Sequence, residues 1–221
     1  MADAKQTIAI IGGTGALGTG LAVRWVEAGH DVVIGSRQAD KAETAAAEVS
    51  QRLGGRPVRG LDNVAAAQAA SIVVLTVPFA HHNSTLEAIR PALQGKILVD
   101  VTVPLVPPKV TRVQLPPEHS AAKQAQILLG DGVKVVSAFQ NVAAAHLESG
   151  HADCDVLVCG DDADARETVV GLVQAAGLKG WHAGPIDNSV VAEALTSVLI
   201  FMNRRYKIDG AGIRITGEPT A

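Results

Sequence analysis

Residues Ile8 to Gly20 read IAIIGGTGALGTG, an apolar run that breaks into glycines and continues at helical spacing. The first four residues are apolar without polar alternation, which is typical of a strand buried on both faces of a parallel sheet. Gly13, Gly15 and Gly18 then stand in the spacing G-x-G-x-x-G. The stretch therefore predicts a strand, a tight turn and a helix.

The glycine spacing has a physical reason in proteins that bind a dinucleotide. The first glycine, Gly13, permits the turn, Gly15 lets the backbone approach a pyrophosphate, and Gly18 lets the helix pack on the strand. A second strand, residues 31–35, follows at the expected distance. A dinucleotide site is the favoured interpretation, and a merely glycine-rich turn is the alternative.

Composition narrows the class of protein. The chain has 221 residues, 48% of them hydrophobic, which is enough for a substantial core. A net charge of -3 lacks the cationic excess that nucleic-acid binding requires. The first residues, MADAKQ, show no apolar signal core, and no long uninterrupted apolar stretch follows. We expect a cytoplasmic protein without a nucleic-acid or membrane partner.

The end of the second strand indicates which nicotinamide cofactor fits. NAD-binding folds place an acidic residue there for the ribose hydroxyls, whereas this chain has Ser36 and Arg37, with Lys41 following. A hydroxyl, a guanidinium and an ammonium can together bind a 2′-phosphate. The pattern favours NADP(H); ordinary solvated charges are the alternative.

The rest of the chain alternates strands and helices, which predicts an α/β fold with a Rossmann-type doubly wound parallel sheet. Residues 54–70 indicate a loop and a short Ala-rich helix, and none of them suggests a catalytic or binding role. We expect an NADP-binding domain over residues 1–140 and a smaller C-terminal α/β domain over 141–221. Further strands are expected at 71–77, 96–103, 133–139 and 155–159, and helices at 41–53, 120–129, 163–176 and 188–206.

Ligands of open α/β sheets bind at the carboxyl ends of the strands. His81 falls at this edge and is either a cofactor contact or an exposed residue at a helix start. Three consecutive alanines, residues 143–145, follow another strand and leave room for a flat ring. A small-residue helix start packed on the sheet explains them as well.

Groups suited to general acid–base chemistry are missing from the expected site. The sequence has no Tyr-x-x-x-Lys and no His convincingly paired with a carboxylate. Reduction of a carbonyl needs such a proton donor, whereas hydride transfer to a delocalised ring does not. We therefore expect a flavin or deazaflavin acceptor, with no catalytic side chain. The spacing of Cys and His residues predicts no metal site.

Six motifs together resemble the NADPH-dependent reductases of the deazaflavin coenzyme F420. The resemblance spans nearly the whole chain and implies a homodimer that exchanges hydride reversibly between nicotinamide C4 and deazaflavin C5. The motifs are GGTGALGTGLA, VVIGSR with a lysine four residues on, VVLTVPF, VVSAF, CGDD and the tail AGIRITG. One departure follows VVSAF, where residues 140–143 read QNVA in place of a family pattern with His and then Pro.

The resemblance also implies roles for individual residues. The phosphate loop corresponds to Thr14, Gly15, Ala16 and Leu17, and the 2′-phosphate clamp to Ser36, Arg37 and Lys41. The nicotinamide half is lined by Val77, His81, Val103 and Ala144, and Ala211 in the tail falls beside the reacting rings.

Two other functions remain open at this point. One is an NADPH-dependent reductase of another acceptor, such as a flavin, a ferric chelate or an imine. The other is an NADP-binding sensor without catalysis, because a fold alone does not establish an activity. The final helix carries an apolar stripe, including Val191 and Val198, that belongs either to the core or to a dimer interface.

Overall fold

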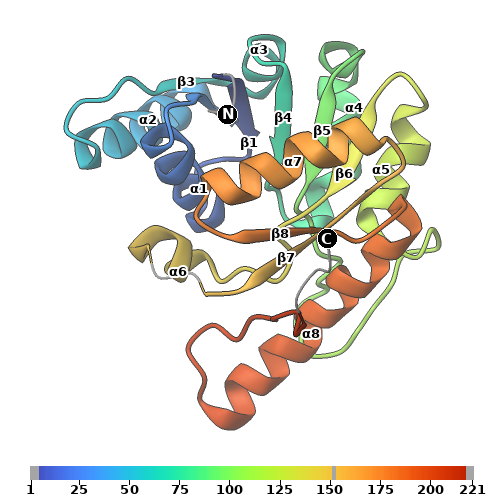
Figure 1. Cartoon of the computed structure of the whole chain (residues 1–221). Coiled ribbons are helices and arrows are strands. Elements are labelled where there is room, and N and C mark those ends of the chain that lie inside the picture. Colours follow the sequence, from blue (N-terminus) through green and yellow to red (C-terminus); the bar gives the residue numbers. More distant parts are fainter. Residues whose placement is uncertain (1–4, 151–152, 218–221) are drawn as a thin grey trace.

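The computed structural model describes residues 5–150 and 153–217 as an eight-stranded sheet with helices on both faces (Figure 1). The strands lie in the order β3-β2-β1-β4-β5-β6-β7-β8. They are β1 (Thr7–Ile11), β2 (Asp31–Ser36), β3 (Arg59–Asp62), β4 (Ile72–Leu75), β5 (Ile97–Asp100), β6 (Lys134–Ser137), β7 (Asp155–Gly160) and β8 (Lys179–His182).

Helices follow most strands, as a doubly wound fold requires. They are α1 (Ala16–Glu27), α2 (Ala39–Arg52), α3 (Asn63–Gln68), α4 (His82–Leu93), α5 (Ala121–Leu129), α6 (Ala144–Ser149), α7 (Ala163–Ala175) and α8 (Ser189–Tyr206), with short 3₁₀ helices η1 (Phe79–His81) and η2 (Ile186–Asn188). Among the described residues, none of these helices is long and apolar enough to cross a membrane.

Two hydrophobic clusters cover the two faces of the sheet. Side chains of α1, α2, α6 and α7 pack on one face, and side chains of α3, α4 and α5 pack on the other. Strand β1 contributes side chains to both clusters, because Ile8 and Ile10 point to the first and Ala9 and Ile11 to the second. The unbroken apolar run thus forms a strand buried on both faces, as predicted.

Pairing is parallel throughout the first six strands, but β7 runs antiparallel to β6. Register in the parallel part aligns Ile11 with Gly35 and with Leu75, so these three strands end at one level. The glycine-rich loop and the residues after β2 and β4 consequently share one edge. The predicted α/β fold with a Rossmann-type sheet is confirmed, and it is mostly rather than entirely parallel. The division at residue 140 remains a prediction.

Strand β3 corrects the expectation for residues 54–70. We expected a loop and a short helix without chemistry, whereas residues 59–62 pair with β2 before helix α3 begins. Gly60 is needed there, because a Cβ at this position would lie 2.3 Å from the backbone of Ala42 in α2. Several expected strands are shorter than predicted; residues 76–77 and 101–103, for example, lie beyond the ends of β4 and β5.

Candidate functional site

The loop between β1 and α1 has the backbone of a phosphate cradle. Gly12, with φ of 71°, is the left-handed residue of the turn, a role we had expected of Gly13. A Cβ at Gly13 would instead lie 2.7 Å from the carbonyl of Ile10. A Cβ at Gly18 would lie 2.6 Å from the Cα of Gly13, so the third glycine permits the close packing of helix on strand, as predicted.

The start of helix α1 is open toward solvent. Gly15 caps the helix, and an ideal Cβ there meets no atom of the described residues within 4 Å. No side chain caps the helix and no acidic residue lies in its first turn. Its first N–H groups and the positive end of its dipole therefore face free space, which fits a pyrophosphate.

Ser36, Arg37 and Lys41 lie together at the carboxyl end of β2. Ser36 is buried, while the two cationic side chains are exposed. Within the part of the chain that the structure describes, neither cation forms an ion pair with an acid. Two uncompensated cations beside a hydroxyl fit a bound phosphate.

Asp62 is the acidic residue that lies beside Ser36 in the sheet, and its carboxylate is engaged with a helix rather than with the cavity. Asp62 stands opposite Ser36 at the end of β3. Its Oδ1 accepts hydrogen bonds from the N–H groups of Val64 and Ala65, both at 3.0 Å, and so caps helix α3. This carboxylate oxygen is therefore directed to the helix rather than to Arg37 or Lys41.

One cavity of about 560 Å³ joins the loop, the clamp and the segment after β4. It brings together Thr14, Ser36, Arg37, Lys41, Val77 and His81 from the predicted set. Its remaining lining residues, which do not belong to the predicted set, are Gly12, Gln38, Asn63, Pro78 and Thr85. Gly15, Ala16 and Leu17 continue the chain from Thr14 into α1, while Val103, Ala144 and Ala211 do not line this cavity.

Asn63 is the most informative of the residues that we missed. It is buried behind the glycine-rich loop, and its Oδ1 accepts a hydrogen bond of 3.4 Å from the N–H of Gly12. The available signal was the run GLDN, residues 60–63, in which an aspartate caps an Ala-rich helix. Asn63 thus supports the turn from the first position of α3, directly after the unexpected strand β3.

The three remaining predicted residues lie on segments nearer the C-terminal part of the sheet. Val103 follows β5, and Ala144 is the first residue of α6. Ala211 lies in the tail, where its N–H donates a 2.9 Å hydrogen bond to Oδ1 of Asn203 in α8. Asn203 therefore fixes the backbone at the position expected beside the reacting rings.

The tail folds back onto the segment that carries Ala144. A Cβ at Gly210 would lie 2.7 Å from the Cβ of Ala143, and one at Gly212 would lie 2.5 Å from the Cβ of Cys154. Further along, the N–H of Asp155 in β7 donates to the carbonyl of Ile213 at 2.8 Å. The structure thus brings Ala211 and Ala144 to neighbouring segments, and glycines permit the close contact.

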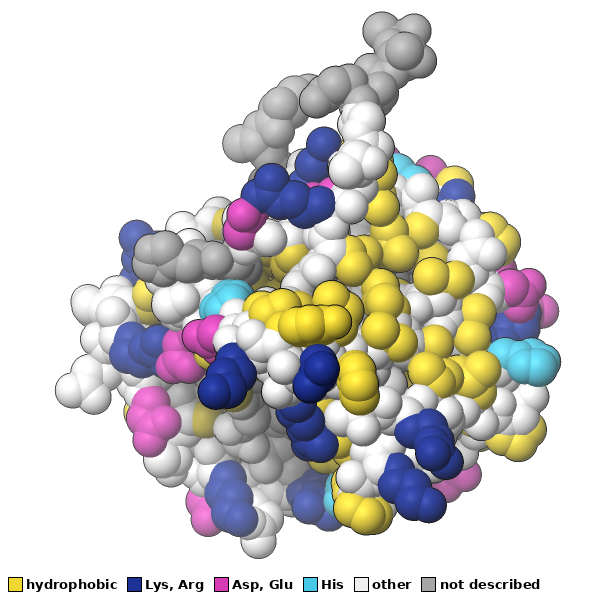
Figure 2. Space-filling model, turned by 90° about the horizontal axis from the view of Figure 1, so that it is seen from below, with side chains coloured by type: hydrophobic (Ala, Val, Ile, Leu, Met, Phe, Trp, Pro, Cys, Tyr) yellow, Lys and Arg dark blue, Asp and Glu magenta, His cyan; other side chains and the backbone are white. Residues whose placement is uncertain are grey.

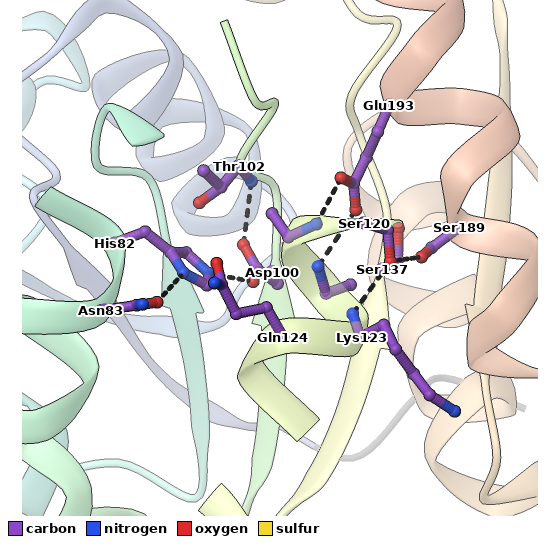
Figure 3. A network of polar contacts seen from close by, with 12 residues as sticks. His82, Asn83, Asp100, Thr102, Ser120, Lys123, Gln124, Ser137, Ser189 and Glu193 are labelled. Carbon is purple, nitrogen blue, oxygen red and sulfur yellow. Dashed lines mark hydrogen bonds and ion pairs between the residues drawn. The ribbon is translucent and has the colours of Figure 1, made fainter. Parts of the chain in front are cut away.

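A buried polar network lies behind the ends of β4, β5 and β6 (Figure 3). Nε2 of His82 is 2.7 Å from Oδ2 of Asp100, and Nδ1 is 3.0 Å from Oδ1 of Asn83. Burial alone would lower the pKa of His82, but the charge of Asp100 and the two hydrogen bonds outweigh it and raise the pKa. With an oxygen facing each ring nitrogen, the protonated ring is the form that fits.

Glu193 of α8 is the third ionisable group of this network. Its two carboxylate oxygens accept hydrogen bonds from the N–H of Ala121 at 2.6 Å and of Ala122 at 3.1 Å, at the start of α5. Burial raises the pKa of Glu193 to about 8, although these two hydrogen bonds act to lower it. We expected no histidine convincingly paired with a carboxylate, and the buried pair of His82 and Asp100 shows that this expectation was wrong.

The fold and the site define a class of protein, a Rossmann-type dinucleotide-binding protein whose cavity carries a hydroxyl and two exposed cations at the end of β2. Residues 7–104 match the family model described as NADP oxidoreductase, coenzyme F420-dependent. The chain is 42% identical to the F420-dependent NADP reductase of Methanocaldococcus jannaschii, covering 95% of this chain and 97% of the relative. It belongs to the family of F420-dependent NADP reductases.

A second relative and one solved structure agree with this assignment, and a more distant structure shares the fold alone. The F420-dependent NADP reductase of Methanothermobacter thermautotrophicus is 40% identical, over 96% of this chain and 95% of the relative. A crystal structure of an Arthrobacter sp. FB24 protein, provisionally named an F420-dependent NADP reductase, superposes with a TM-score of 0.81 at 30% identity and covers 96% of this chain and 100% of that one. An imine reductase from Bacillus cereus shares the fold at 17% identity, with a TM-score of 0.66, over 92% of this chain and 62% of that one.

Proposed function

We propose that the protein transfers a hydride reversibly between C4 of the nicotinamide of NADP(H) and C5 of the deazaflavin of coenzyme F420, with the rings stacked and no obligatory acid or base. NADPH:F420 oxidoreduction is the activity of the family, and NADP(H) and F420 are its co-substrates. The stacked geometry and the residues that hold it are the proposal.

The cavity at the carboxyl ends of β1, β2 and β4 is the observation that carries the proposal. Ser36, Arg37 and Lys41 line it at one end and Val77 and His81 at the other. A dinucleotide with its 2′-phosphate at the clamp and its pyrophosphate at the start of α1 directs its nicotinamide toward the residues after β4 and β5. Those residues are largely apolar, which suits an uncharged reduced nicotinamide.

The protein's contribution to hydride transfer is placement and exclusion of water. The nicotinamide supplies the hydride, and the deazaflavin ring delocalises the charge it receives. Val103, Ala144 and Ala211 offer small, apolar surfaces on which two flat rings can approach. Orientation of two reactants contributes strongly to rate without any proton transfer by a side chain.

The test is to mix the purified protein with NADPH and coenzyme F420 and follow the visible absorbance of the deazaflavin, with NADH as the control. We expect rapid loss of absorbance with NADPH and little with NADH. Absence of bleaching in a protein that still binds NADPH would contradict the acceptor and favour a flavin, a ferric chelate, an imine or a sensor function.

Replacement of Ala144 tests the ring-stacking side of the proposal. We expect Ala144→Leu to slow single-turnover hydride transfer at least 10-fold, because the added side chain occupies space that the rings need. NADPH affinity, which depends on the distant clamp, should change less than 3-fold. Ala145→Leu is the matched control, since Ala145 is the next residue of α6 and is exposed. Full activity of Ala144→Leu would place the ring pocket elsewhere.

We further propose that the protein is a homodimer formed through the exposed side of α8. Apolar side chains gather on this face of the molecule (Figure 2). The stripe predicted in the final helix lies mostly outside the core, which favours the interface over the core. The exposed large hydrophobic residues of α8 and the tail are Val191, Val198, Phe201, Tyr206, Ile208 and Ile215, each with 41–66% of its surface exposed.

The dimer predicts a solution mass of twice the 22.7 kDa of one chain in sedimentation equilibrium. Phe201→Asp should shift this mass toward the monomer, because it places a charge in the centre of the buried face. Ile127→Asp provides the control, since Ile127 is 63% exposed on α5 rather than on α8. A monomeric wild-type protein would contradict the proposal.

A further inference from the structure

The segments that follow β4 and β5 are held together by one buried side-chain pair. Strand β4 leads through Val77 into η1 and then into α4, which begins at His82. Strand β5 ends at Asp100 and leads to Val103. The ion pair between His82 and Asp100 joins these two segments, which also carry the residues that we place against the nicotinamide.

Each hydrogen-bonding oxygen of Asp100 contacts a different segment at the carboxyl ends of the strands. Oδ2 faces His82, and Oδ1 accepts a 2.9 Å hydrogen bond from the N–H of Thr102, which turns the chain after β5. The carbonyl of Asp100 accepts a 2.8 Å hydrogen bond from Nε2 of Gln140, in the segment after β6. Asp100, at the end of β5, thereby connects to the segments that follow β4 and β6.

The side chain of His82 is buried, like that of Asp100, and has partners at both ring nitrogens. Only 1% of its side chain is exposed, so it does not contact a substrate, and its ring lies 6.1 Å from that of Phe79 in η1. The ionisable groups that face it are Asp100 from β5 and Glu193 from α8; Asn83, from its own helix, binds the other ring nitrogen. Figure 3 shows His82 and Asn83 on one side of Asp100 and Glu193 on the other.

We propose that His82, through its ion pair with Asp100, is a positioning residue for hydride transfer. The pair sets the separation between the segment that carries Val77 and His81 and the segment that carries Val103, and so fixes the nicotinamide relative to the acceptor ring. This inference rests on the ring placement proposed above. The distant 2′-phosphate clamp does not depend on the pair, so the pair affects hydride transfer much more than affinity for NADPH.

Two replacements of His82 separate positioning from bulk packing. Gln can place its Nε2 near the position of the imidazole Nε2 and still donate to Asp100, whereas Leu has similar bulk and donates nothing. We expect His82→Leu to slow single-turnover oxidation of NADPH by F420 at least 10-fold with less than 3-fold change in the dissociation constant for NADPH. His82→Gln should stay within 3-fold of the wild type in both.

A matched control exists in the same chain. His182 and Glu167 form another imidazole–carboxylate pair, with 2.8 Å between Nε2 and Oε2, on the exposed surface of β8 and α7. His182→Leu should leave the transfer rate unchanged. Equal rates for His82→Leu and the wild type, or losses of rate and NADPH affinity by the same factor, would overturn the proposal.

Asp100→Asn is a second variant that tests the positioning role of His82 if His82→Leu does not fold. Asn retains the shape and an acceptor for Thr102 but removes the charge that keeps His82 protonated. We expect a slower transfer whose loss of rate at alkaline pH begins at a lower pH than in the wild type. An unchanged pH profile in folded Asp100→Asn would count against the proposal.

Val103→Phe distinguishes a failure of this inference from a failure of the ring placement. Loss of transfer in Val103→Phe together with full activity in His82→Leu would reject only the positioning role. Full activity in both variants would reject the ring placement and the positioning role together.

Discussion

Arg37→Asp is expected to weaken NADPH binding about 10- to 150-fold, which corresponds to ~1.5 to 3 kcal/mol for a hydrogen bond between charged groups. The guanidinium lies in the cavity with no acidic partner among the described residues, so its charge is available to a 2′-phosphate. NADH lacks this phosphate and should lose far less affinity. Titration of both nucleotides by fluorescence or calorimetry measures the difference.

Arg90→Asp is the control for the change in net charge. Arg90 is exposed on α4 and does not line the cavity. This variant should bind NADPH nearly as the wild type does, apart from a small salt-dependent effect. Equal losses for NADPH and NADH in Arg37→Asp would show that the clamp is not at the end of β2.

The second large effect is a fall in folding stability between pH 4.5 and about 8, caused by Glu193. The ordinary pKa of 4.5 applies to the unfolded chain, and the folded pKa is raised to about 8. Between these values the folded chain retains a proton that the unfolded chain has released, so stability is full below pH 4.5 and is lost as pH rises through 8. The slope is at most ~1.4 kcal/mol per pH unit, and the total is roughly 3 to 5 kcal/mol.

Glu193→Gln should flatten this dependence, because the amide does not titrate. Urea unfolding at pH 5, 6.5 and 8 measures it. A residual fall above pH 6.5 is expected from His82, whose pKa is also raised, so that its contribution is lost at alkaline pH. Glu48→Gln, an exposed replacement on α2, should keep the wild-type slope. An equally steep slope in Glu193→Gln would assign the effect to another group.

Much of the dinucleotide side of the site could be predicted because its determinants are local. The strand, the glycines and the next strand end, with Ser36 and Arg37, lie within 30 residues of sequence. Backbone geometry at a tight turn restricts residue type strongly, as Gly12 and Gly18 show. Such constraints are visible in one sequence without any knowledge of tertiary contacts.

Strand β3 escaped prediction because it lies at the edge of the sheet. Its sequence, RGLD, has a single large apolar residue, Leu61, and none of its residues is fully buried. An edge strand paired on one side does not need the apolar run that marks a central strand. Asn63, which directly follows it, was missed for the same reason.

The buried network could not be predicted, because its members come from distant parts of the chain. Glu193 interrupts an apolar stripe and would ordinarily be placed on the solvent side of its helix. Its partners are backbone N–H groups of Ala121 and Ala122, about 70 residues earlier, which sequence patterns do not reveal. Only the packing of α8 against the start of α5 explains a carboxyl group in the interior.

The positions of the site residues along the chain determine the order in which the ribosome makes them. All residues that line the cavity lie between Gly12 and Thr85, whereas Ala211 follows much later in the chain. Chains are made from the N-terminus, so the ribosome completes every cavity residue long before it reaches Ala211. The dinucleotide side that we propose is thus made well before the side that we propose for the acceptor.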